Sequence, residues 1–354
     1  MKVKTMIKDI AKIDPNFSAS NELNLTDAVF YDVKENPFCL YGVFYKDGFY
    51  RRMPEAVAKS VSDGVHILHT HTSGGRLRFL TDSPYVAISA KTPMGSEARY
   101  MPPTGARGFD LYADGKYVQV FTPPVPLKED YDSVRDLPDG GLHEVTVHFP
   151  LYFDVKELRL GLKQNAKFLP IPEERVGKKV LFYGSSITQG GCVSRPGMAY
   201  PNILANKLGF DLVNLGFSGN AKGEDAMCDY IIAQNPDVFV YDYDHNAPSI
   251  AHLNDTHERF FLRFREAHPD TPIIMLSSPD VIFKGEPFRR RRDVIKKTYE
   301  NAIARGDENV FFLDGETLFG NEDADLCTVD ACHPNDLGHY RMAMTIVPIL
   351  TKLL

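Results

Sequence analysis

Two short segments of the chain carry residue types suited to nucleophilic acyl transfer. Ser186 follows the apolar run at 180–184, at a tight turn that Gly184 permits. Near the C-terminus, Asp330 precedes His333 by three residues. A carboxylate at this spacing can orient an imidazole and stabilise its charged form, as base catalysis on a serine requires. Either segment alone is more often structural, because a serine after a strand commonly caps a helix or turn.

Two further loops offer hydrogen-bond donors after apolar runs. Gly219 lies in the loop after 211–216, where backbone N–H groups can face a developing oxyanion, and Asn246 follows the run at 237–243. Each is by itself an ordinary turn residue. In an open α/β sheet, however, ligands gather outside the carboxyl ends of the strands, so these loops are expected to line one site together with Ser186.

The elements that position these residues occupy the C-terminal half. Apolar runs alternate there with helical patterns, which predicts a parallel sheet with helices on both faces. The predicted strands are 180–184, 211–216, 237–243, 272–277 and 309–315, and the predicted helices are 197–209, 224–235, 254–267, 289–305 and 335–353.

The preceding half has a different pattern. Short alternating segments at 76–80, 85–91, 116–122 and 144–150 are separated by Gly, Pro and Asp, which predicts an antiparallel β-sandwich. The Pro-bearing stretch at 168–179 is predicted to be a hinge between the two halves. The predicted organisation is a β-sandwich domain at 1–167, a linker at 168–178 and an α/β domain at 179–354.

The order Ser, Gly, Asn, His of the four loops resembles the SGNH, or GDSL-like, hydrolase family. The resemblance implies a flavodoxin-like three-layer α/β/α domain with Ser186 as nucleophile, His333 as general base and Asp330 as its orienting carboxylate. It also implies an oxyanion hole formed by the amides of Ser186 and Gly219 and by the side chain of Asn246.

Two positions depart from the family pattern. Ser185 stands where the name-giving motif has Asp, and residues 244–247 read D-H-N-A where G-x-N-D is usual. Neither change removes a group that performs the chemistry. In the β-rich half, GGRLRFLTDS (74–83) and GFDLYADGKYVQVF (108–121) resemble the jelly-roll-like β-sandwich that precedes the catalytic domain in some SGNH carbohydrate esterases.

The resemblance implies a serine esterase that works through an acyl-enzyme, without a metal or organic cofactor. The expected substrate is a short-chain ester, in particular an acetyl ester of a sugar or oligosaccharide, since the chain has no long hydrophobic lid. Two alternatives remain open. One is a lysophospholipase- or thioesterase-type acyl hydrolase, and the other is a catalytically silent carbohydrate-binding protein.

Composition restricts the partners. The 354 residues carry a formal net charge of −7, which gives no basic field for nucleic acid. No apolar run is long enough for a signal core or a membrane span. Five cysteines without CxxC spacing predict reduced thiols and a cytoplasmic protein. The oligomeric state is open, a homo-oligomer included.

A structural role is the favoured interpretation for several other residues. His69 and His71 are expected to share a strand face near His66, which could suggest a metal, but no Cys or acidic neighbour completes a site, so strand histidines are favoured. Cys332 is interpreted as a small buried thiol. The run Arg289–Arg292 is expected to be a salt-bridged helix surface, with anionic-ligand binding as the alternative.

Overall fold

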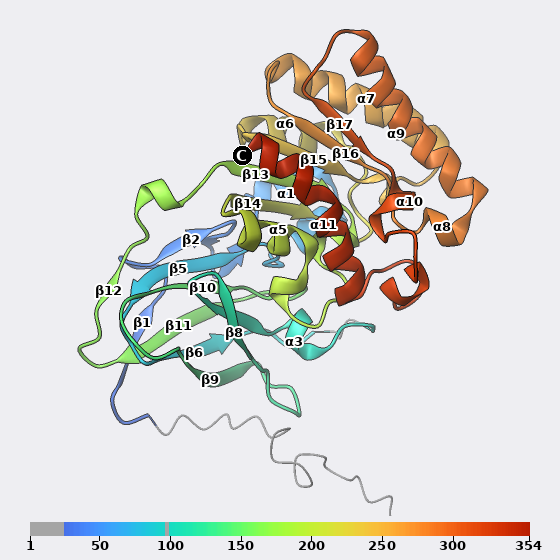
Figure 1. The fold of residues 1–354 in the computed structure, drawn as a ribbon. Coiled ribbons are helices and arrows are strands. Elements are labelled where there is room, and N and C mark those ends of the chain that lie inside the picture. The colour runs from blue at the N-terminus through green and yellow to red at the C-terminus, as the bar shows by residue number, and fades with distance from the viewer. Residues whose placement is uncertain (1–24, 96–98) are drawn as a thin grey trace, which may run out of the picture.

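The computed structural model of the chain describes residues 25–95 and 99–354. The C-terminal part is built on a five-stranded parallel sheet with the order β14-β13-β15-β16-β17 (Figure 1). Its strands are β13 (Lys179–Gly184), β14 (Asp211–Gly216), β15 (Val238–Asp242), β16 (Ile273–Leu276) and β17 (Val310–Leu313). The predicted parallel sheet is therefore confirmed, and the order places the topological switch point at the carboxyl end of β13.

Helices cover both faces of this sheet, which confirms the three-layer α/β/α fold. On one face β13 and β15 share an apolar core with α6 (Asp225–Ala233), α7 (Ile250–Ala267) and α9 (Glu286–Ala304). On the other face the alternate strand residues pack against α5 (Tyr200–Leu208) and α11 (Asp336–Leu353). Shorter helices follow individual strands: α4 (Ser186–Gln189), α8 (Val281–Lys284) and α10 (Gly315–Leu318).

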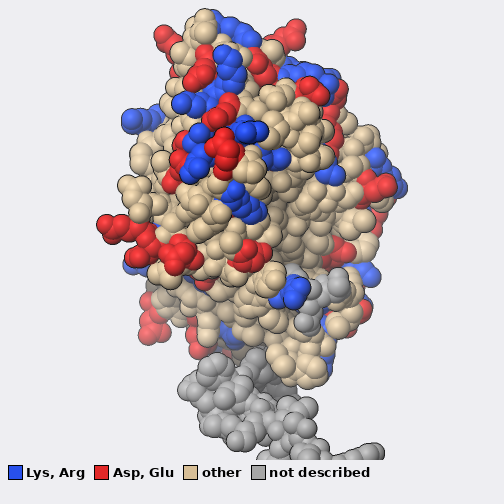
Figure 2. All heavy atoms as spheres, turned by 90° about the vertical axis from the view of Figure 1, so that its right-hand side faces the viewer, with Lys and Arg blue, Asp and Glu red and all other residues tan. Residues whose placement is uncertain are grey.

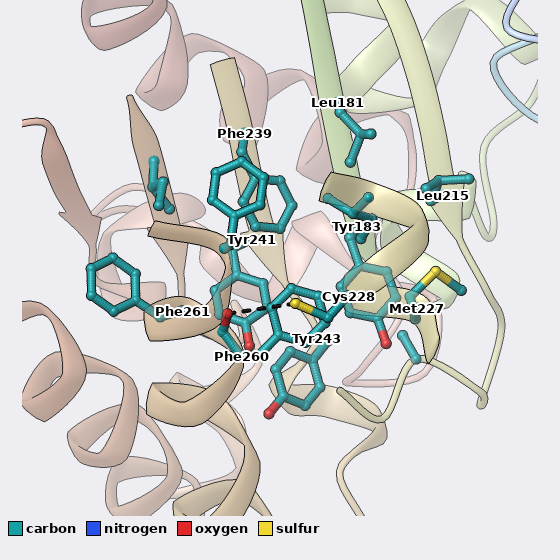
Figure 3. Packing of buried hydrophobic residues seen from close by; sticks show 14 of the residues in the cluster. Leu181, Tyr183, Leu215, Met227, Cys228, Phe239, Tyr241, Tyr243, Phe260 and Phe261 are labelled. Atoms are coloured by element: carbon teal, nitrogen blue, oxygen red, sulfur yellow. Dashed lines mark hydrogen bonds between the residues drawn. The ribbon is translucent and has the colours of Figure 1, made fainter. Parts of the chain in front are cut away.

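The first of these cores is rich in aromatic rings beneath the strands that lead to the candidate site (Figure 3). Tyr183 of β13 and Tyr241 of β15 both stack on Phe260 of α7, with ring centroids 5.6 and 5.0 Å apart. Phe239 of β15 packs on Phe264 at 4.8 Å. Because such rings bury large apolar areas in defined geometry, they fix the strand ends to which the functional loops are attached.

The N-terminal part forms two antiparallel sheets that enclose one apolar core, as a β-sandwich does. One sheet has the order β1-β11-β6-β9. The other has the order β12-β5-β10-β7-β8, with β2 also paired to β5. The strands are β1 (Ala28–Asp32), β2 (Cys39–Tyr41), β5 (Arg76–Thr81), β6 (Tyr85–Lys91), β7 (Phe109–Ala113), β8 (Lys116–Phe121), β9 (Asp130–Asp136), β10 (His143–His148), β11 (Glu157–Lys163) and β12 (Phe168–Leu169), beside a hairpin β3 (Phe44–Lys46) and β4 (Phe49–Arg51) and a short helix α3 (Pro103–Ala106).

One segment of the N-terminal part departs from the predicted sandwich. Helices α1 (Glu55–Val61) and α2 (Asp63–Leu68) pack into the core of the α/β layers, where α1 contacts α6. Ser62 starts α2 by accepting a hydrogen bond from the Val65 amide. The expectation that His69 and His71 share a strand face is therefore wrong, because His69 ends helix α2 and His71 forms an isolated bridge to Asp154.

Within the described residues, no helix combines the length and apolar character that crossing a bilayer requires.

Candidate active site

Ser186 stands at the switch point because the residues around it force a tight turn. A side chain at Gly184 would collide with the Asp242 carbonyl, 2.4 Å from where its Cβ would lie, so only glycine fits. Ser185 then caps α4, its hydroxyl accepting a hydrogen bond from the Ile187 amide at 3.2 Å. An Asp at this position can cap the helix in the same way, so the departure of Ser185 from the family pattern leaves the turn intact. Ser186 follows as the first residue of α4 and is only 7% exposed.

The loop before α11 brings the predicted base to this serine. His333 Nε2 lies 3.0 Å from Ser186 Oγ, and His333 Nδ1 lies 2.9 Å from Asp330 Oδ2. Asp330 Oδ1 also accepts a hydrogen bond from the His333 amide at 2.7 Å, so the carboxylate fixes both the ring and its backbone. The three predicted residues therefore meet in the order that proton transfer from the serine requires.

The charge on Asp330 is stabilised where it stands. Partial burial works against ionisation, but hydrogen bonds from the His333 amide and ring outweigh it and lower the pKa of this carboxyl. A bridge between Thr328 and Pro334 closes the loop, and the Val329 amide donates to the His333 carbonyl at 3.0 Å. Asp330 is therefore an anion held in position to stabilise an imidazolium.

The two predicted oxyanion donors lie in loops at the same sheet edge. Gly219 has a φ of 70°, a left-handed conformation that glycine adopts without strain. Asn246 accepts a hydrogen bond from the Ala221 amide through Oδ1, at 3.3 Å. This contact joins the two loops and leaves the Nδ2 group of Asn246 as the end that can donate to a ligand.

Residues of the N-terminal part donate hydrogen bonds to backbone carbonyls of α4, the helix that begins with Ser186. The Tyr152 hydroxyl donates to the Ser186 carbonyl at 3.0 Å, and the Ser73 hydroxyl donates to the Gln189 carbonyl at 2.6 Å. Gln189 is fully buried, and its Nε2 donates to the Leu151 carbonyl at 3.1 Å. Its Oε1 accepts from the Ser218 amide at 2.9 Å. The side chain of Gln189 thus links the β-sandwich to the loop that carries Gly219.

A second link between the two parts of the chain involves the segment 190–198, which follows α4. The carboxylate of Asp110, in the sequence G-F-D-L-Y at 108–112, is 2.7 Å from Arg195 Nη1 and accepts from the Gly197 amide at 2.7 Å. Burial works to lower the pKa of Arg195, but Tyr112 and Asp110 outweigh it and raise that pKa, so the guanidinium stays charged. This buried pair ties the segment beside the nucleophile to β7.

The run Arg289–Arg292 largely forms the expected salt-bridged surface. Arg289 pairs with Glu316 at 2.8 Å, and Arg292 lies near Asp293, Asp314 and Glu316. Figure 2 shows acidic and basic side chains interspersed on the face that carries α8 and α9. Arg291 differs, since its Nη2 donates to the carbonyls of Asp244 and Ala247, at 2.8 Å for the latter.

Cys332 lies in the loop directly before His333. The Cys332 thiol lies 3.4 Å from His245 Nε2, and burial raises its pKa to about 11, which disfavours a nucleophilic thiolate.

Tyr152, Gln189 and Arg291 were not predicted as parts of the site. Their partners lie on other elements, so no local pattern in the sequence marks them.

A groove of ≈ 460 Å³ flanks the histidine loop. It is lined by Tyr100, Pro102, Cys192, Ser194, Val329, Asn335, Asp336 and Leu337. Tyr100 and Pro102 come from the N-terminal part, and Tyr100 is 49% exposed. The Asp336 carboxylate already accepts the Ser194 amide, so most of the surface offered to a ligand is apolar or aromatic.

Comparisons with known proteins agree with this geometry. The model of the GDSL-like Lipase/Acylhydrolase family matches residues 177–351, and the model of the N-terminus of Esterase_SGNH_hydro-type proteins, GxDLY, matches residues 28–168. The search of curated proteins gives no match.

Solved structures resemble the chain over most of its length. A protein of Bacteroides ovatus described as a GDSL-like lipase is 29% identical, covers 92% of this chain and 98% of its own, and has a TM-score of 0.83. Salicylyl-acyltransferase SsfX3 from a tetracycline biosynthetic pathway is 21% identical over 93% and 98%, with a TM-score of 0.76. A family two carbohydrate esterase from Clostridium thermocellum in complex with cellohexaose is 15% identical over 89% and 99%, with a TM-score of 0.61. The similarities to the acyltransferase and to the carbohydrate esterase show that these two proteins share the two-part fold of this chain.

Proposed function

This chain belongs to the GDSL-like lipase/acylhydrolase (SGNH hydrolase) family and carries an N-terminal GxDLY domain, and from that premise we propose that it hydrolyses short-chain, chiefly acetyl, esters of sugars or oligosaccharides. The observation that carries the proposal is the hydrogen-bonded series Ser186, His333, Asp330, with distances of 3.0 and 2.9 Å.

In the proposed mechanism, His333 Nε2 takes the proton of Ser186 Oγ as that oxygen attacks the ester carbonyl. Negative charge then develops on the carbonyl oxygen, where the amides of Ser186 and Gly219 and the Nδ2 group of Asn246 donate hydrogen bonds. The imidazolium, stabilised by Asp330, returns the proton to the leaving alcohol. Water, deprotonated by His333, attacks the acyl-enzyme, and the acid departs as Ser186 recovers its proton.

Two features support a sugar as the leaving alcohol. The groove beside His333 presents the half-exposed ring of Tyr100, and aromatic rings stack on the apolar faces of pyranoses. The similar esterase from Clostridium thermocellum is described in complex with a cello-oligosaccharide. The expected cytoplasmic location, with imported oligosaccharides as substrates, stays a prediction that cell fractionation tests.

The test compares acetate release from acetylated xylo- and cello-oligosaccharides with hydrolysis of p-nitrophenyl acetate, butyrate and octanoate. We expect the acetyl esters to be preferred and Ser186→Ala to abolish every activity. Preference for octanoate would favour a lysophospholipase- or thioesterase-type hydrolase. Oligosaccharide binding without hydrolysis of any ester would favour a silent carbohydrate-binding protein.

A further inference from the structure

Three side chains that the proposed mechanism does not use converge beside the histidine loop. His245 follows β15, Asp280 follows β16, and Cys332 directly precedes His333. His245 Nε2 lies 3.0 Å from Asp280 Oδ2 and 3.4 Å from Cys332 Sγ. One ligand atom from each residue lies within 4.8 Å of the other two. A nitrogen, an oxygen and a sulfur donor therefore meet at one point.

The surroundings orient these donors as the outer contacts of a metal site do. Ser278 Oγ lies 2.9 Å from His245 Nδ1 and donates to Asp280 Oδ1. Because the Ser278 hydroxyl gives its proton to Asp280, it accepts from His245 Nδ1–H, and a metal ion can replace the proton that Nε2 shares with Asp280 Oδ2. The side chain of Asp280 is 0% exposed, so its negative charge requires a positive charge beside it, which Lys284 supplies in this structure and a metal ion could supply instead.

The two separations from His245 Nε2 are compatible with a tetrahedral ion. With zinc bonds of about 2.05 Å to nitrogen, 2.0 Å to oxygen and 2.3 Å to sulfur, the separations of 3.0 and 3.4 Å give angles of about 95° and 103° at the metal. An imidazole with a thiolate selects Zn²⁺ over Mg²⁺ or Ca²⁺. We propose that His245, Asp280 and Cys332 form a binding site for Zn²⁺, with water as the fourth ligand.

Lys284 makes this site reversible. Its Nζ lies 2.6 Å from Asp280 Oδ2, where it supplies the positive charge that Zn²⁺ would bring. Lys284 ends the short helix α8, and its side chain is 34% exposed, so it can swing into solvent. Zinc and the ammonium group therefore compete for one carboxylate, and removal of the ammonium group strengthens metal binding.

Zinc at this position affects the neighbouring base. A zinc bond to the Cys332 sulfur constrains the loop in which His333 comes next, and a misplacement of that base by about 1 Å can cost 10²-fold in rate. Zinc is therefore a reversible inhibitor. This consequence rests on the proposed function, whereas the binding itself does not.

The test uses the full chain and Co²⁺ as a spectroscopic probe. We expect one Co²⁺ per chain, with the visible bands of tetrahedral cobalt and a near-ultraviolet thiolate charge-transfer band, both removed by Zn²⁺. His245→Ala and Cys332→Ser are expected to lose these bands, and Lys284→Met is expected to bind about tenfold more tightly. Cys192→Ser, a thiol outside the cluster, is the matched control and keeps them.

Absence of the bands in both the wild-type protein and Lys284→Met would overturn the site. Bands that persist in His245→Ala but disappear in Asp330→Asn would also overturn it, by placing the metal on the triad loop instead. Where the protein hydrolyses p-nitrophenyl acetate, Zn²⁺ is expected to inhibit the wild type and spare Cys332→Ser. A protein inactive on every ester would refute the proposed function, while the cobalt spectra would still decide the site.

Discussion

Gln189 offers a sharp test of how the β-sandwich serves the site. Its side chain joins the Leu151 carbonyl at 3.1 Å to the Ser218 amide at 2.9 Å, one residue before Gly219. Gln189→Met keeps the length of the side chain and removes both hydrogen bonds, together with the contact of Nε2 with His71 Nδ1 at 3.2 Å. The Leu151 carbonyl and the Ser218 amide then lose their partner, at about 1–3 kcal/mol each, so we expect the free energy of unfolding to fall by about 2–6 kcal/mol.

The effect on catalysis follows from the loop that is released. Complete loss of one oxyanion donor costs on the order of 10²–10³ in kcat, and a donor that is misplaced but present costs less. We therefore expect Gln189→Met to lower kcat for p-nitrophenyl acetate by about 10- to 100-fold. KM is expected to change by less than about threefold, because the oxyanion exists only along the reaction path.

Ser73→Ala is the matched control. It removes the hydrogen bond of 2.6 Å to the Gln189 carbonyl without touching the link to Ser218. We expect it to lower stability by about 1 kcal/mol and to leave kcat within about threefold of wild type. Steady-state kinetics and urea unfolding measure both quantities. A folded Gln189→Met with wild-type kcat, or an equal loss in Ser73→Ala, would show that the Gln189 side chain does not position the loop that carries Gly219.

Three further predictions test other contacts of the site. Arg291→Met frees the carbonyls that flank Asn246 and is expected to lower kcat about tenfold, whereas Arg290→Met, on the exposed helix face, is expected to leave it unchanged in the same assay. Asp110→Asn breaks a buried ion pair and is expected to cost about 3 kcal/mol in urea unfolding, against less than about 1 kcal/mol for Asp225→Asn at an exposed pair; equal costs would contradict this. Burial, with the nearby charge of Asp244, raises the pKa of Asp242 to about 8 from 3.8. The folded carboxyl therefore keeps a proton that the unfolded chain releases, and its stabilisation is lost as pH rises between these values, by up to about 1.4 kcal/mol per unit. Asp242→Asn is expected to gain stability relative to wild type from pH 5 to 8, and parallel curves would exclude this role.

The catalytic half was predictable because its strands are buried on both faces. Runs such as 180–184 are almost wholly apolar, and the helices between them show a period of 3.6 residues, so chain order alone led to the parallel sheet. The loops after the strands then followed from topology, and Ser186, Asp330 and His333 meet as predicted.

The contacts between the two parts were not predictable. Residues 55–68 lie in the half predicted as a β-sandwich but form helices, because α1 and α2 bury their apolar faces against the α/β layers. Tyr152 and Gln189 each meet a partner in the other part of the chain, 34 and 38 residues away, on surfaces that exist only after both parts pack together. Spacing along the chain carries no signal for such pairs.

In the proposed mechanism, Ser186 carries the acyl group. The most direct measurement is intact-protein and peptide mass spectrometry after brief reaction with p-nitrophenyl acetate and acid quenching, on the wild type and on Ser186→Ala. We predict one acetyl group on the peptide that contains Ser186, formed before steady-state turnover and absent in Ser186→Ala. Hydrolysis without that adduct, or undiminished turnover by Ser186→Ala, would show that Ser186 is not the nucleophile.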